Sequence, residues 1–205
     1  MGGTWPKTPA QALDMLLEGN KRFIVGDRLH PHQDTDHRTA VAPAQHPFAV
    51  LFGCADSRVA AEIIFDRGLG DLFVVRTAGH VIGPEVLGSI EYGVDVLGAP
   101  LIAVLGHDSC GAVAATREAM VNGVTPPGFM RDVVERVMLS VLSAPDGLTN
   151  PDAAGEAHVG YTVDLLVDRS NIIAQRVADG SCAVVGLSYR LAEGSVRLIA
   201  GHGVP

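Results

Sequence analysis

Two short segments of this sequence carry side chains that bind soft and borderline metal ions. They are Cys54-Ala-Asp56-Ser-Arg58 and His107-Asp-Ser-Cys110, and each directly follows a short apolar run. Two thiolates and one imidazole form a ligand set that Zn²⁺ prefers, and three protein ligands leave a fourth tetrahedral position for water or substrate. The residue types therefore predict a catalytic zinc site made by Cys54, His107 and Cys110.

The two segments are expected to meet because both follow predicted strands. The apolar runs at 48–52 and 101–105 are typical of buried strands, and ligands gather outside the carboxyl ends of strands in open α/β sheets. His107 and Cys110 lie three residues apart at the start of a predicted helix, which directs both side chains toward one face. The N-terminus of that helix also favours a thiolate at Cys110.

Other interpretations of these three residues stay open. Buried structural cysteines and a core histidine need no metal, although this does not explain two matching strand ends. A thiol nucleophile with histidine as its base could do acyl or redox chemistry, although one thiol would then be unused. A purely structural zinc site usually has four Cys or His ligands, and no fourth is obvious in the sequence.

Asp56 and Arg58 are two residues apart, so their side chains can project to the same side of an extended segment. A carboxylate beside an arginine stays ionised and accepts hydrogen bonds. Asp56 could orient a zinc-bound hydroxide, or occupy the open zinc position itself as a reversible fourth ligand. A plain salt bridge within a loop is the alternative.

The composition narrows the class of protein. Of the 205 residues, 47% are hydrophobic and 19% are charged, and the net charge is −8 without a basic cluster. We therefore expect no nucleic-acid partner and no membrane partner. No apolar stretch reaches the length of a membrane helix, and the first eleven residues lack the apolar core of a secretory signal. Three cysteines are too few for a disulfide framework, so the expected location is cytoplasmic.

The element pattern predicts one α/β domain over 1–205. From residue 47 onward, short apolar strands alternate with amphipathic helices, which indicates a mostly parallel central β-sheet flanked by helices. Residues 1–46 are predicted to form an N-terminal helix and arm, and 47–205 an α/β zinc core that ends in a strand pair. The predicted helices are 8–25, 59–65, 84–97, 110–121, 130–142 and 154–178, and the predicted strands are 48–52, 71–76, 101–105, 182–189 and 195–199.

At these residues the sequence closely resembles the β-class carbonic anhydrases. The two zinc segments match that family, and the match reaches from the N-terminal helix to about Gly111, and more loosely to the last strands. Further agreement lies in Glu18-Gly-Asn-Lys-Arg-Phe23, Phe73-Val-Val-Arg76-Thr-Ala-Gly79 and Ser89-Ile-Glu91-Tyr92.

The resemblance implies reversible hydration of CO₂ to bicarbonate and a proton, by attack of a zinc-bound hydroxide. Cys54, His107 and Cys110 would hold one Zn²⁺ per subunit, Asp56 would orient the nucleophile, and Arg58 would hold Asp56. The family forms homodimers or pairs of dimers with active sites at the subunit boundary. A homo-oligomer that binds CO₂ and bicarbonate is therefore implied.

The resemblance also implies a set of substrate-binding residues. In the plant-like branch of the family a glutamine nine residues before the first zinc cysteine binds substrate, and here that residue is Gln45. Phe73 and Tyr92 match apolar pocket positions supplied by the partner subunit, and Gly111 follows the last zinc ligand. Members with a non-catalytic bicarbonate site carry tryptophan where this chain has Leu51, so that site is not expected.

Two alternative functions remain at this stage. A zinc enzyme of the same architecture could act on another small linear substrate such as CS₂. A catalytically silent zinc-binding module could keep the fold, although the intact pair of Asp56 and Arg58 speaks against it.

Overall fold

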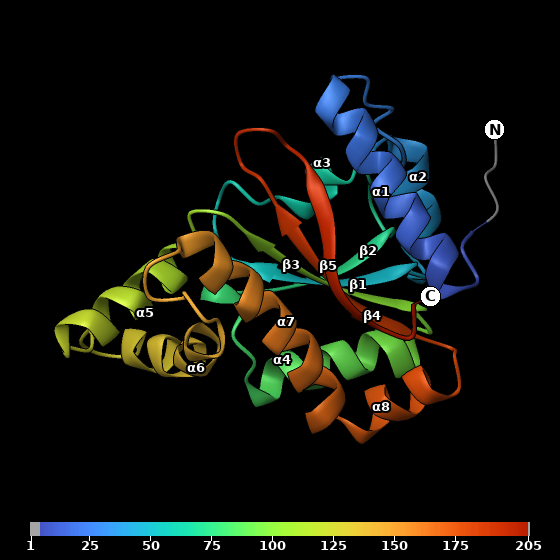
Figure 1. The fold of residues 1–205 in the computed structure, drawn as a ribbon. Helices are drawn as coiled ribbons and strands as arrows, with labels where there is room; N and C mark the ends of the chain where they lie inside the picture. Colours follow the sequence, from blue (N-terminus) through green and yellow to red (C-terminus); the bar gives the residue numbers. More distant parts are fainter. Residues whose placement is uncertain (1–4, 205) are drawn as a thin grey trace.

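The computed structural model describes residues 5–204, so residues 1–4 and 205 of the predicted domain lie outside the described part. At its centre is a five-stranded sheet in the order β2-β1-β3-β4-β5 (Figure 1). The first four strands are parallel and β5 is antiparallel to β4. The strands are β1 Ala49–Cys54, β2 Leu72–Thr77, β3 Leu101–His107, β4 Ala183–Tyr189 and β5 Val196–His202. The predicted mostly parallel α/β sheet with a terminal strand pair is confirmed.

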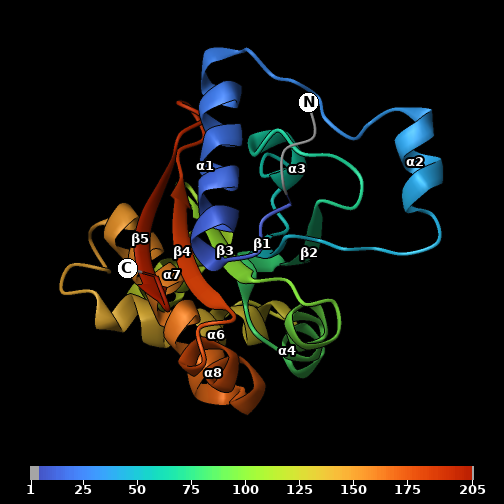
Figure 2. The ribbon, with the colours of Figure 1, turned by 90° about the vertical axis from the view of Figure 1, so that its right-hand side faces the viewer.

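Helices cover both faces of this sheet, which is why its central strands are continuously apolar. Every residue of β1 and β3 is buried. One face packs against α1 (Pro9–Val25) and α3 (Ala61–Ile64). The other face packs against α4 (Pro84–Glu91), α7 (Pro151–Arg169) and α8 (Asn171–Ala178), so helices and sheet form three layers (Figure 2).

A third apolar cluster lies beyond the carboxyl ends of β1 and β3. It joins α5 (Gly111–Asn122) and α6 (Met130–Ser143) to the start of α7. Cys54 and Cys110 are buried in this cluster. The third cluster therefore shields the two cysteines of the predicted zinc segments from the solvent.

The local sequence explains where the first helix begins and ends. Thr8 caps α1 by accepting a hydrogen bond from the backbone of Gln11, and Pro9 occupies the first helical position. The helix ends at Gly26, whose φ of 75° is the left-handed conformation that glycine adopts without strain. Trp5 packs edge-on against Phe48, which fixes the segment that precedes α1.

Some predicted boundaries are wrong. The region 27–45, expected to be an irregular arm, contains a short helix, α2 (Thr35–Val41), which is capped by Asp34 and buries no residue. The predicted helix 154–178 is two helices, because Ser170 adopts an extended conformation and caps α8. The predicted helix 59–65 is helical only in α3, and the helix from Pro84 passes into a π-helical turn at Tyr92–Val96.

The arm that carries α2 is set apart from the rest of the molecule in Figure 2. His32 contacts the buried carboxylate of Asp71 at 2.6 Å, and His37 lies 2.9 Å from the carbonyl of Leu69. Within residues 5–204 no helix is long and apolar enough to cross a membrane.

Candidate metal centre

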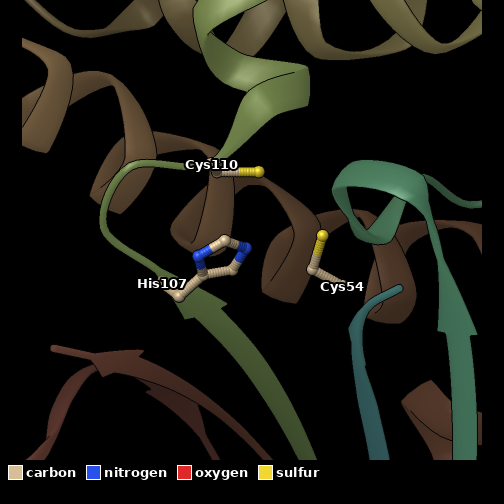
Figure 3. Close-up of side chains that lie close together, drawn as sticks. All are labelled: Cys54, His107 and Cys110. Carbon is tan, nitrogen blue, oxygen red and sulfur yellow. The ribbon is translucent and has the colours of Figure 1, made fainter. Parts of the chain in front are cut away.

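The three predicted ligands come from two neighbouring strands and one helix start. Cys54 is the last residue of β1, His107 is the last residue of β3, and Cys110 is the residue that caps α5 (Figure 3). The strands β1 and β3 pair directly, while the chain leaves β1 for β2 on the other side. The site therefore lies at the topological switch point of the sheet, where ligands bind in open α/β folds.

The geometry of the three side chains fits a tetrahedral cation. One ligand atom from each of Cys54, His107 and Cys110 lies within 4.8 Å of the others, and all three residues are buried. Metal–ligand bonds of about 2.0–2.3 Å place neighbouring ligand atoms roughly 3.3–3.8 Å apart, so only a small contraction separates this group from a zinc site.

The orientation of the imidazole is fixed by its other nitrogen. His107 Nδ1 lies 2.7 Å from the carbonyl oxygen of Asp108, which can only accept, so Nδ1 carries the proton and Nε2 has the free lone pair. Nε2 is buried and has no hydrogen-bond partner among residues 5–204. A buried nitrogen of this kind that faces two sulfurs is suited to a cation.

The electrostatics of the two thiols favour loss of a proton. The neighbouring Cys110 thiol lowers the pKa of Cys54 to about 4 against the opposing effect of burial, with smaller contributions from His107 and two backbone N–H groups. The same pairing, together with burial, raises the pKa of Cys110. Burial opposes protonation of His107, but the Cys54 thiolate outweighs it and raises the pKa of His107. A divalent cation would replace the shared proton and hold both sulfurs as thiolates.

The structure brings the predicted pair Asp56 and Arg58 together beside this group. Arg58 Nη2 donates to Asp56 Oδ2 at 2.7 Å, and Nε and the backbone N–H donate to Oδ1 at 3.0 and 2.9 Å. These bonds from Arg58 hold the pKa of Asp56 well below its usual range. Asp56 Oδ2 lies 3.9 Å from His107 Nε2, so the carboxylate reaches the fourth side of the ligand group.

Sequence reasoning missed the role of Arg76 in fixing this segment. Arg76 Nε donates to the carbonyl of Cys54 at 2.9 Å, and Nη2 donates to the carbonyl of Asp56 at 2.6 Å. The parallel register pairs Arg76 with Gly53, so a correct β1–β2 alignment would have indicated this contact. Leu51 is buried in the core on β1. It occupies the position at which family members with a non-catalytic bicarbonate site carry tryptophan.

The other predicted substrate residues do not lie at the metal ligands of their own chain. Phe73 pairs with Val50, four residues or roughly 13 Å along the strand from Cys54. Tyr92 lies beside Phe73, with ring centroids 6.1 Å apart. Gln45 precedes β1 and is exposed at the end of the strand opposite Cys54.

Gly111 is the one predicted substrate residue that does lie beside the ligands. It is the first residue of α5, directly after Cys110, and a side chain at this position would meet nothing within 4 Å. Its backbone N–H belongs to the first turn of the helix, where N–H groups have no partner within the helix.

A buried group of two thiols and one imidazole at the switch point of a parallel sheet is typical of an α/β metalloenzyme. Comparison with known sequences and structures identifies the family to which the chain belongs. The family model for carbonic anhydrase matches residues 49–196. Carbonic anhydrase 2 of Mycobacterium tuberculosis (strain H37Rv) is 58% identical over 93% of this chain and 92% of its own length. The carbonic anhydrase of Mycolicibacterium smegmatis is 56% identical, over 93% of both chains.

Solved structures agree with the sequence relatives. The β-carbonic anhydrase of Coccomyxa, solved with acetazolamide, superposes with a TM-score of 0.70 at 26% identity, over 91% of this chain and 86% of its own. The β-carbonic anhydrase CcaA gives a TM-score of 0.70 at 26% identity, over 92% and 91%. The chain belongs to the carbonic anhydrase family, in its β class, and is an enzyme of that family.

Proposed function

We propose that this chain catalyses the reversible hydration of CO₂ to bicarbonate and a proton, with one Zn²⁺ per subunit held by Cys54, His107 and Cys110. The observation that carries the proposal is the convergence of the three ligand atoms within 4.8 Å. The free Nε2 of His107 supports it, because that nitrogen is buried without a partner in the described part of the chain. The zinc, when bound, would supply a site at which the pKa of water falls far enough for reaction near neutral pH.

Asp56 acts as the orienting acceptor in this proposal. Because Arg58 occupies both carboxylate oxygens, the group stays ionised and is held in one orientation. An ionised carboxylate can only accept a hydrogen bond, so it selects one orientation of a reacting water and aims its lone pair at CO₂. The 3.9 Å between Asp56 Oδ2 and His107 Nε2 also suits Asp56 for a second role, as a reversible fourth ligand.

Backbone and side-chain donors would stabilise the bicarbonate oxygens. The N–H of Gly111 opens α5, where the helix dipole favours a developing negative charge. Gln45 is the side-chain donor that the resemblance to the plant-like branch implies, and Phe73 and Tyr92 form the apolar wall beside uncharged CO₂. These roles require a partner subunit, because Gln45, Phe73 and Tyr92 lie away from the ligands of their own chain.

A homodimer or a pair of dimers, with active sites at the subunit boundary, follows from this placement. Tyr92, which lies beside Phe73 of the edge strand β2, is an exposed apolar side chain, which is consistent with a covered surface. A solved structural neighbour from Sordaria macrospora, 20% identical, is a tetrameric β-carbonic anhydrase.

The three cysteines of the chain are all unpaired thiols, which supports a cytoplasmic location.

The test combines metal analysis with stopped-flow CO₂ hydration, before and after chelation and after zinc is restored. The proposal expects about one zinc per chain, loss of hydration on chelation and recovery with zinc. A parallel assay with CS₂ separates the alternative substrate: hydrolysis of CS₂ without CO₂ hydration would favour that enzyme. Bound zinc with no turnover of either substrate would favour a silent zinc-binding module.

A further inference from the structure

Ser140, His158 and Gly79 form a buried chain of hydrogen bonds beside the proposed metal centre, and the proposed mechanism does not use it. His158, on α7, is 2% exposed and Ser140, on α6, is fully buried. Ser140 Oγ lies 2.8 Å from His158 Nδ1, and His158 Nε2 lies 2.7 Å from the carbonyl oxygen of Gly79. Buried polar groups are costly unless they are paired, so this chain is a specific feature of the core.

The direction of these hydrogen bonds follows from the acceptor at one end. A carbonyl oxygen can only accept, so His158 Nε2 carries the proton and donates it to Gly79. Burial lowers the pKa of His158, which keeps the ring neutral and leaves Nδ1 with a lone pair. The single hydroxyl proton of Ser140 has two acceptors within reach: the Val137 carbonyl at 2.6 Å, to which Ser140 donates, and this lone pair at 2.8 Å. The Gly79 carbonyl thus selects the tautomer, and Ser140 contacts the other ring nitrogen and holds the ring in position.

Gly79 is the link between this chain and the first metal ligand. Its backbone N–H, in the peptide that joins Ala78 to Gly79, is one of the groups that lower the pKa of the Cys54 thiol. Gly79 has φ 61° and ψ 24°, a left-handed conformation, and a Cβ at this position would lie 2.5 Å from the Cβ of Ala112. Only glycine therefore fits at this position.

The ring of His80 adds a packing surface to the same arrangement. His80 follows Gly79 and is buried, and its ring centroid lies 4.3 Å from that of His158. Ala112, on the other side of Gly79, presents its own backbone N–H to the Cys110 sulfur. Gly79, whose N–H faces the Cys54 sulfur, therefore packs against Ala112, whose N–H faces the Cys110 sulfur.

We propose that His158 is a positioning residue for the metal centre: by binding the carbonyl of Gly79 it holds this glycine in place, and the N–H on the other side of the same Cα then stays directed at the Cys54 sulfur. The inference rests on the proposed zinc site. Residues behind the ligands commonly contribute about 10- to 100-fold to metal affinity, because they fix the ligand and set its electron density. Loss of an N–H donor leaves a sulfur richer in electron density, which shifts the sulfur-to-metal charge-transfer band of a cobalt-substituted protein to longer wavelength.

Two substitutions at His158 separate hydrogen bonding from packing. His158→Phe keeps a planar ring and removes the N–H that Gly79 accepts, whereas His158→Gln keeps a donor. We expect the zinc dissociation constant of His158→Phe to rise about tenfold or more, measured by competition with a chromophoric chelator. The cobalt charge-transfer band should move to longer wavelength in His158→Phe, and His158→Gln should restore most of both properties.

A matched pair of serine substitutions controls for loss of stability. Ser140 and Ser170 are both buried and both hydrogen-bonded, but Ser170 binds Glu91 and caps α8 away from the sulfurs. Ser140→Ala should weaken zinc binding in the same direction as His158→Phe, whereas Ser170→Ala should bind zinc like the wild type even where its melting temperature falls. The Ser140 variant keeps the inference testable if His158→Phe does not fold.

The outcomes are distinct. Wild-type zinc affinity and an unshifted cobalt band in His158→Phe would overturn the inference. So would a His158→Gln protein as impaired as His158→Phe, or equal losses of zinc affinity in the two serine variants. If the wild-type chain itself binds no zinc, the proposed function fails together with this inference, whereas the other contrary results leave the proposed function intact.

Discussion

Arg58 donates hydrogen bonds to both carboxylate oxygens of Asp56, at 2.7 Å from Nη2 and 3.0 Å from Nε. The same Nη2 lies 3.4 Å from the carbonyl of Ser109, in the segment between His107 and Cys110. The arginine therefore connects the segment after β1 to the segment after β3. The orientation of Asp56 is set relative to both halves of the candidate metal centre, which its proposed role as an orienting acceptor requires.

Replacing the orienting carboxylate should separate metal binding from turnover. In Asp56→Asn the amide NH₂ donates where one carboxylate oxygen accepts, and the ion pair with Arg58 is lost. We expect near-stoichiometric zinc and a fall in kcat of about 10²-fold or more, measured by stopped-flow CO₂ hydration. Asp95→Asn, which breaks the exposed 2.9 Å pair with Arg176, is the matched control and should keep full activity. Wild-type rates in Asp56→Asn would remove Asp56 from the mechanism.

Mixed dimers test whether each active site draws on two subunits. Cys54→Ser should abolish zinc binding, and Gln45→Ala should impair a site that receives Gln45. Consider a dimer of one Cys54→Ser chain and one Gln45→Ala chain. If the sites are shared, one site combines the intact zinc ligands of the Gln45→Ala chain with the intact Gln45 of the Cys54→Ser chain. We therefore expect about half the wild-type activity per dimer, because one of two sites is complete. Activity no higher than that of the Gln45→Ala homodimer would place Gln45 and the zinc ligands of one chain in the same site.

The buried His80 should make the fold sensitive to acid. Burial, followed by the charges of His158 and His107, lowers the pKa of His80 well below its ordinary value. Below about pH 6.5 the unfolded chain binds a proton that the folded chain excludes. The free energy of unfolding therefore decreases as the pH falls through this range, by up to about 1.4 kcal/mol per pH unit for one such group.

The substitution His80→Asn tests this dependence. Asparagine does not titrate, and it tolerates the left-handed backbone at this position, where φ is 40°. The free energy of unfolding of the zinc-loaded proteins should be measured with urea between pH 5 and 8. The difference in this free energy between wild type and variant should become smaller as the pH falls. Parallel curves would mean that His80 is not the group that resists protonation.

The close approach of β3 and α7 should be intolerant of a single methyl group. A Cβ at Gly106, next to His107, would lie 2.2 Å from Val159 Cγ2. We expect Gly106→Ala to lower the free energy of unfolding by about 1–3 kcal/mol and to displace His107. Denaturant unfolding of Gly106→Ala, Val159→Ala and the double variant should show the double variant less destabilised than the sum, because the removed methyls make room.

A second glycine provides the control for this steric argument. At Gly88, in α4, a Cβ would meet nothing within 4 Å, and the helical backbone there is compatible with alanine. Gly88→Ala should be neutral or slightly stabilising, since alanine favours helix more than glycine does. Strictly additive effects at Gly106 and Val159 would contradict the proposed clash.

The sequence was sufficient to predict the sheet and the convergence of the three candidate zinc ligands. Apolar runs flanked by glycine indicate buried strands, and parallel strands bring their carboxyl ends to one edge, which places Cys54 near His107. Those inferences depend only on local patterns and on one general rule of sheet geometry.

Features set by tertiary contacts were not predictable in the same way. The apolar period of 154–178 continues across Ser170, so periodicity alone does not reveal the break that this cap imposes. The Ser140–His158–Gly79 chain joins residues from three separate elements, and no spacing in the sequence indicates it. The positions of Gln45 and Phe73 relative to Cys54 likewise depend on strand register.

X-ray absorption spectroscopy at the zinc edge of the purified enzyme tests the central claim most directly. The account predicts two sulfur neighbours at about 2.3 Å and one imidazole nitrogen at about 2.0 Å, with one further light-atom ligand. It also predicts loss of one sulfur in Cys110→Ala but not in Cys182→Ala, because Cys182 is buried in the core directly before β4. A wild-type zinc shell without sulfur, or a shell unchanged by Cys110→Ala, would contradict it.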